Sequence, residues 1–103
     1  MNPRRVHALF LRHYPDIALV SCEWTHIIQD GKPGTDMINE GLSSLKVSEV
    51  LVHVHRKLGN FLPLSLATNL IYENVGQANI RIADRDFSRF VIVAQNGVMT
   101  TWP

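Results

Sequence analysis

The chain contains too little cysteine to build a disulfide framework. Cys22 is its one cysteine, so neither an internal disulfide nor a cysteine-based zinc site can form. No apolar run reaches the about 18 residues that a membrane-spanning helix needs. The N-terminal stretch has no small-residue cleavage site of the kind that ends a signal peptide. These absences lead us to expect a cytoplasmic protein with no membrane partner.

Positive and negative charges are also nearly balanced along the chain. The 10 Lys and Arg residues stand against 9 Asp and Glu residues, so the net charge is +1. This balance argues against a strongly basic nucleic-acid coat protein and against an acidic-tail protein. The chain contains no phosphate-binding glycine loop, nucleophile elbow or His-Glu-x-x-His zinc motif. We therefore expect neither a cofactor nor a metal.

What the chain does have is the composition of an ordinary globular protein. Hydrophobic residues make up 46% of its 103 residues, which is too many for a disordered chain. A chain of this size buries about two thirds of its surface on folding. We therefore expect one domain that spans residues 1–103.

The hydrophobic periodicity changes along the chain and predicts a mixture of helices and strands. Helices are predicted over residues 3–13, 35–44, 47–58 and 63–75, and strands over 17–28, 80–83, 87–94 and 98–102. Asn2 is a good cap for the first helix, and Pro3 suits its first position. Helices followed by a run of strands indicate an α+β, two-layer domain, with helices packed on a mainly antiparallel sheet of about four strands that ends in a C-terminal β-hairpin.

Residues 47–58 fit two periods at once. Their apolar side chains recur at the spacing of one buried helix face, and Gly59 follows as a helix stop. The same residues also alternate as a strand does, with Val50, Val52 and Val54 on one side. We favour the helix, because a stop signal has no use in a strand.

The C-terminal hairpin is indicated by the dipeptide Asn96-Gly97. A two-residue turn there pairs Ala94 with Met99 and Val93 with Thr100, and makes both faces of the hairpin largely apolar. A sheet with one covered face alternates apolar and polar residues instead. We therefore expect a second copy of the chain to cover the other face; the alternative is that the first helix covers it.

Paired histidines make residues 53 and 55 candidates for a metal or proton-transfer site. On a strand, His53 and His55 share one face and lie about 6.6 Å apart at Cα. On a helix they point about 200° apart and cannot act together. The helix favoured for this segment therefore makes them two surface histidines.

Arginines gather in two places. Arg81, Arg85 and Arg89 alternate with Asp84 and Asp86 around one turn, where they can bind a phosphate or carboxylate or pair with the aspartates. The first helix carries a second basic group, which consists of Arg4, Arg5, His7, Arg12 and His13. This face can contact phosphates or an acidic partner, or can simply be solvated.

The closing segment, residues 90–103, resembles the final hairpin of small bacterial ribonuclease toxins of the RelE-like and contact-dependent-inhibition type. Those strands often end in Thr-Ala-Tyr-Pro, and here Thr100 matches the threonine. Trp102 stands where the tyrosine is expected, and an indole cannot do the acid–base work of a phenol. The resemblance covers about 15 of the 103 residues, and it implies an antiparallel sheet and an RNA substrate.

Our leading functional hypothesis is a small, non-enzymatic accessory protein of the kind found on phage or mobile elements. It self-associates as a homo-oligomer and binds a protein or small-molecule partner. The basis is the missing catalytic motif together with a hairpin that is apolar on both faces. A further interpretation places a ligand pocket beneath Trp24 and Trp102.

The alternative is an RNA-cleaving, toxin-like endoribonuclease with a RelE-like fold. In it, His53 or His55 is the acid–base group. Arg81 or Arg89 binds the phosphate, and Thr100 orients it. RNA is a partner only under this alternative.

Overall fold

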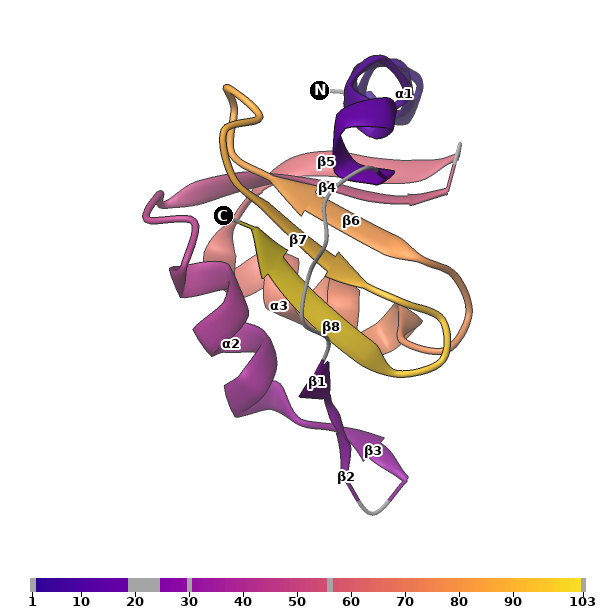
Figure 1. Cartoon of the computed structure of the whole chain (residues 1–103), viewed down its shortest axis with the longest axis vertical. Coiled ribbons are helices and arrows are strands. Elements are labelled where there is room, and N and C mark those ends of the chain that lie inside the picture. The colour runs from indigo at the N-terminus through magenta and orange to yellow at the C-terminus, as the bar shows by residue number, and fades with distance from the viewer. Residues whose placement is uncertain (1, 19–24, 30, 56, 103) are drawn as a thin grey trace.

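A computed structural model describes residues 2–18, 25–29, 31–55 and 57–102. Its helices are α1 (Pro3–Ala18), α2 (Thr35–Ser43) and α3 (Leu64–Asn74). Its strands are β1 (Thr25–His26), β2 (Ile28–Gln29), β3 (Lys32–Pro33), β4 (Glu49–His55), β5 (Leu58–Pro63), β6 (Ile80–Ala83), β7 (Phe90–Val93) and β8 (Val98–Trp102). The main sheet is antiparallel with the order β1-β8-β7-β6-β4-β5, and β2 pairs with β3 in a separate two-stranded ribbon (Figure 1).

The larger part of the core lies between the sheet and the helices α2 and α3. β4 contributes Val50, Val52 and Val54, which are all but fully buried. They pack in one cluster with Ile38 and Leu42 of α2 and with side chains of α3. Because successive residues of a strand point to opposite faces, the residues between these valines must face another cover.

That second cover is α1. Val6 and Phe10, one helical turn apart, are buried against Leu51 of β4 and Ala83 of β6. The backbone of β5 comes close to the helix at Gly59, where an added Cβ would lie 3.2 Å from Val6 Cγ1 and 2.9 Å from the carbonyl oxygen of the neighbouring strand. Helices therefore lie on both faces of the sheet, α1 on one and α2 with α3 on the other (Figure 1).

The predicted helix over residues 47–58 is wrong, because this segment forms β4 and the start of β5. The apolar spacing arose because β4, an interior strand, is buried on both faces from Val50 to Val54, and all but His53 of these five residues are apolar. Its β-branched valines favour a strand, where their restricted χ1 rotamers fit the pleat. Gly59, which was taken as a helix stop, is paired with His53 in the sheet.

The C-terminal hairpin is present, with a register one residue away from the predicted one. Val93 pairs with Met99 and Ile92 with Thr100. The loop has three residues, because Ala94 pairs with Val98 through its N–H and Gly97 takes a φ of +86°. This one-residue difference turns Met99 to the face of α2, where it touches Gly41, and turns Thr100 to the face of α1.

The N-terminal region also differs from its prediction. α1 continues to Ala18 through Pro15, which lacks an N–H but tolerates the helical φ. The predicted strand over residues 17–28 is therefore wrong at its start, and among the described residues of this range strand is found at β1 and β2. Cys22 and Trp24 lie outside the described residues, as does the side chain of Trp102.

The α+β class, with helices packed on an antiparallel sheet, is confirmed. The main sheet has six strands in the described part of the chain rather than about four. The predictions for α2, α3 and β6 agree with the structure within a residue or two, and Asn2 caps α1 by accepting a hydrogen bond from the Arg5 N–H at 2.9 Å. Within the described ranges, no helix is long and apolar enough to cross a membrane.

Candidate binding site between helix α1 and the sheet

One row of paired residues crosses the sheet on the face of α1. His53 of β4 pairs with Arg81 of β6, Arg81 pairs with Ile92 of β7, and Ile92 pairs with Thr100 of β8. Residues paired across neighbouring strands project from the same face of the sheet. The antiparallel register thus brings His53, Arg81 and Thr100, which were predicted as site residues, onto one face.

The two ends of this row have different surroundings. His53 and Arg81 lie on neighbouring strands. Thr100 is two strands away from Arg81, which is about 10 Å at the usual strand spacing. Thr100 is buried, with 4% of its surface exposed. The site therefore centres on His53 and Arg81, with Thr100 outside it.

His53 meets a second histidine that the sequence did not single out as a partner. His7 of α1 lies with its Nδ1 2.8 Å from Nε2 of His53, a distance at which one of the two nitrogens donates to the other. The ring of Phe10, one turn further along α1, lies 5.6 Å from the ring of His53. Burial of Val6 and Phe10 against the sheet fixes α1 in place and holds His7 at the edge of the contact.

The environment of His53 keeps its imidazole neutral at physiological pH. Burial is the largest cause, followed by the positive charges of His7, Arg81 and His55, and together they lower its pKa from 6.5 to about 4. Its Nδ1 is also the one buried side-chain nitrogen or oxygen in the described part of the chain that has no hydrogen-bond partner. An unsatisfied buried polar atom costs about 1–3 kcal/mol and is uncommon outside functional sites.

A pocket of about 110 Å³ lies beside this pair, and we name it the histidine pocket. It is lined by His7, Phe10, Leu11, His53 and Arg81. Every charged or ionisable side chain in this set is a nitrogen base or cation, and none is a carboxylate. The walls therefore combine an apolar side, from α1, with donors suited to an anion.

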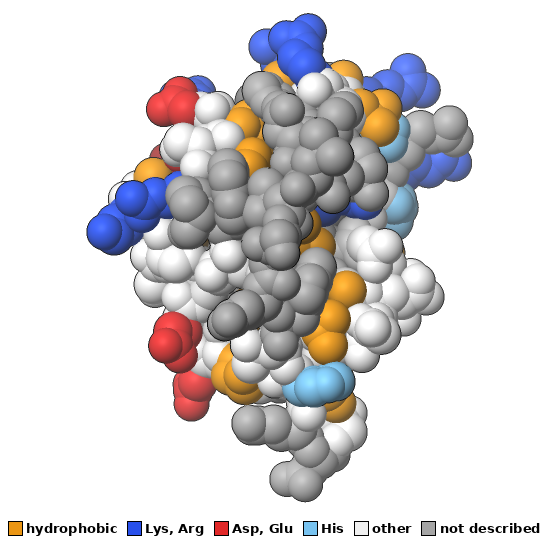
Figure 2. Space-filling model, in the orientation of Figure 1, with side chains coloured by type: hydrophobic (Ala, Val, Ile, Leu, Met, Phe, Trp, Pro, Cys, Tyr) orange, Lys and Arg blue, Asp and Glu red, His pale blue; other side chains and the backbone are white. Residues whose placement is uncertain are grey.

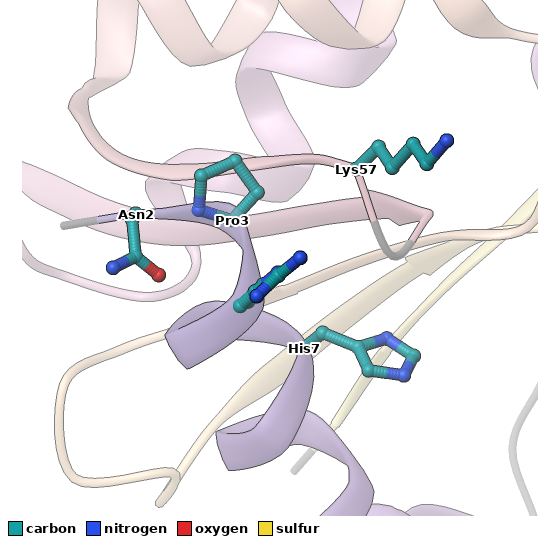
Figure 3. Close-up of a pocket in the computed structure, with 5 residues that line it drawn as sticks. Asn2, Pro3, His7 and Lys57 are labelled. Atoms are coloured by element: carbon teal, nitrogen blue, oxygen red, sulfur yellow. The ribbon is translucent and has the colours of Figure 1, made fainter.

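A wider pocket of about 710 Å³ adjoins it, and we name it the basic pocket. It is lined by Asn2, Pro3, Arg4, His7 and Lys57. Figure 3 shows Lys57 coming from the β4–β5 turn on one side, and Asn2, Pro3 and His7 coming from the N-terminal end of α1. His7 lines both pockets, so the two are neighbours.

The charge of the surface agrees with this lining. In the orientation of Figure 1, Lys and Arg side chains lie at the top of the molecule, where α1 is, and others lie on the left edge between Asp and Glu side chains (Figure 2). Cations are therefore present over the end of the molecule that α1 occupies, although they are not confined to it.

Two other predicted site residues lie elsewhere. His55 is exposed beyond a register irregularity in β4, and its Nδ1 accepts a hydrogen bond from the Lys57 N–H at 3.1 Å. Arg89 donates through Nη1 to the carbonyl oxygen of Ser44, just after α2, at 3.0 Å. The structure therefore does not bring His55 or Arg89 into the histidine pocket.

Neither a metal-ligand cluster nor a similarity to known proteins indicates what this site binds. No three or more His, Cys, Asp or Glu side chains of the described ranges come together as metal ligands. No family model, no curated protein and no solved structure matches the chain. The chemistry of the site is that of its own residues: two imidazoles, a guanidinium and apolar side chains of α1.

Proposed function

We propose that this protein is a non-enzymatic binding protein for a small anion, a phosphate or carboxylate group, which it holds in the histidine pocket. The observation that carries this function is the set of ionisable side chains around the pocket: Arg81 and two imidazoles, with no carboxylate among the described lining residues. Arg81 supplies a fixed cation whose fork geometry matches both kinds of anion. A volume of about 110 Å³ suits a group of that size.

Binding fits the histidine pair better than catalysis does. In cleavage of a phosphodiester, a general base and a general acid must reach two different oxygens of the reacting group. His7 and His53 instead bond to each other at 2.8 Å, so they present one polar surface rather than two flanking groups. A bound anion needs only that surface and the cation beside it.

Titration calorimetry with inorganic phosphate tests the proposed function. We expect wild-type protein to bind with a dissociation constant of about 1 mM or lower and R81Q to lose most of this affinity. Lys32 lies on β3, at the opposite end of the molecule from α1 (Figure 1), so K32Q is the matched control and should bind as wild type does. Equal binding by R81Q and K32Q, or no binding by the wild type, contradicts the function.

RNA cleavage is the second candidate, and one observation favours it. His53, Arg81 and Thr100, three of the residues assigned to that activity, share a cross-strand row on one face. Induced expression in growing cells discriminates the two functions. Growth arrest with fragmented RNA, abolished in H53A, supports cleavage, whereas harmless expression with intact RNA supports binding alone.

Self-association stays a prediction, but the reason first given for it no longer applies. The hairpin was expected to need a second copy over one of its faces. Val93 on one face is 0% exposed, and Phe90 and Thr100 on the other are each 4% exposed within a single chain. Light scattering on dilute protein measures the oligomeric state independently of ligand binding.

A further inference from the structure

We infer that the natural ligand carries two phosphate groups on a compact, hydroxylated body, as a sugar bisphosphate does, and that it spans the histidine pocket and the basic pocket. This inference rests on the proposed function and extends it, because it names the ligand class. His7 lines both pockets, so they are neighbours and a single molecule can reach from one to the other.

The second anionic group follows from the cations of the basic pocket. Arg4 comes from α1 and Lys57 from the turn between β4 and β5, and both line the same pocket. No described residue of that lining carries a negative charge. Both side chains are exposed, and they come from separate segments with no described carboxylate between them in the lining, so the pocket suits a second anionic group.

The histidine pocket supplies independent evidence that a ligand completes this region. His53 is 5% exposed, and its Nδ1 has no hydrogen-bond partner. It lies against the same His7 that separates the two pockets. The polar groups of both subsites thus belong to one connected surface.

The size of the ligand follows from the geometry of α1. The basic pocket uses Asn2, Pro3 and Arg4 of the helix, and the histidine pocket uses Phe10 and Leu11. These two sets are centred seven to eight residues apart along the chain, which corresponds to about 11 Å along the helix axis. A hexose that carries a phosphate at each end of its carbon chain is about as long as this, whereas a free phosphate occupies one subsite at a time.

The lining of the basic pocket also indicates the chemistry of the part of the ligand that joins its two phosphates. Apart from the shared His7, its described residues offer no aromatic ring on which a nucleobase could stack. Single-stranded nucleic acids and nucleotides usually rely on such platforms. The pocket of about 710 Å³ is of ordinary size for a small-molecule site and offers an amide, from Asn2, and cations to hydroxyl groups.

Titration calorimetry with a hexose bisphosphate, the corresponding hexose monophosphate and inorganic phosphate tests the inference. We expect the bisphosphate to bind about tenfold tighter than the monophosphate. In the double variant R4Q/K57Q, this preference should disappear, while the binding of inorganic phosphate in the histidine pocket, which depends on Arg81, should remain. The control R12Q removes an exposed arginine of α1 that lines neither pocket, and it should keep the preference.

The outcomes separate this inference from the proposed function. Phosphate binding that depends on Arg81, with equal affinities for the two sugars, overturns the bisphosphate ligand and leaves the proposed function standing. Tighter binding of a nucleoside diphosphate than of the hexose bisphosphate overturns the hydroxylated body. Absence of binding by all three probes overturns both. Thermal unfolding of each variant shows that a lost affinity is not a lost fold.

Discussion

His7 and His53 are 46 positions apart in the chain, yet their imidazoles meet edge to edge, with Nδ1 of one 2.8 Å from Nε2 of the other. The contact joins α1 to β4, an interior strand of the main sheet. Behind it, Nδ1 of His53 is buried without a partner, and beside it lies Arg81. The proposed site, and most of the measurements that follow, depend on this one contact.

The first prediction concerns stability against pH. Since the pKa of His53 is about 4 in the folded chain and 6.5 when unfolded, the unfolded chain binds the additional proton between these values. The free energy of unfolding should be greatest above pH 6.5 and fall as pH drops, by roughly 2 kcal/mol from His53 at pH 5. Urea unfolding at pH 7.5 and pH 5 measures this difference.

The exposed His55 on the same strand provides the control. H55Q should keep the full pH dependence, whereas H53F should lose this part of it. An NMR titration of His53 in the wild-type protein measures its pKa without any substitution in the core. A His53 pKa at or above 6.5 contradicts the prediction.

The second prediction tests whether α1 belongs to the core. Phe10 is 2% exposed against the sheet, and Leu11, next to it, is 60% exposed. F10A should lower the free energy of unfolding by about 3–5 kcal/mol, because it opens a cavity between the helix and the sheet. L11A should change it by about 0.5 kcal/mol or less. Similar losses for both variants would show that α1 does not pack as described.

The sequence predicted several helices and strands of this fold, but not the contacts between distant segments. Helices α2 and α3 were recognisable because polar residues and Gly or Pro separate them from their neighbours. β4 was not, because its buried stretch carries apolar residues on both faces, which also fits a helical spacing, and the β-branched valines are what favour a strand. Nothing near His7 in the sequence shows that α1 brings it to His53, since that contact depends on how the whole helix crosses the sheet.

The third prediction tests the register of the hairpin. Val93 and Met99 are direct partners, and Ala94 N–H bonds to the Val98 carbonyl, so 93 and 99 form a non-hydrogen-bonded pair. Such pairs have the Cα separation that a disulfide tolerates. In a C22S background, V93C/M99C should oxidise to an intramolecular disulfide.

V93C/T100C, which matches the register predicted from the Asn96-Gly97 turn, is the comparison. Its two side chains point to opposite faces of the sheet and should keep free thiols. Thiol titration and intact mass report both results. If V93C/T100C oxidised and V93C/M99C stayed reduced, the result would support the two-residue turn and contradict the observed register.

The fourth prediction is that anion binding is coupled to the uptake of a proton by His53. An anion beside His53 favours its charged form and raises its pKa from about 4, so binding is accompanied by proton uptake. His7, Arg81 and His55 are the charged or titratable groups that act on His53, and each adds positive charge that an anion offsets. Sulfate keeps its own charge between pH 8 and pH 5.5, so its affinity should rise as pH falls through this range. An affinity that falls, or stays constant, contradicts the coupling.

The most direct test of the proposed anion site is an NMR titration of the histidine side chains with inorganic phosphate at pH 7. We predict that the imidazole resonances of His7 and His53 shift together and reach saturation, that those of the exposed His26 and His55 move little, and that R81Q abolishes the shifts. Unmoved His7 and His53 resonances in the wild type, or equal shifts with and without Arg81, would contradict the account.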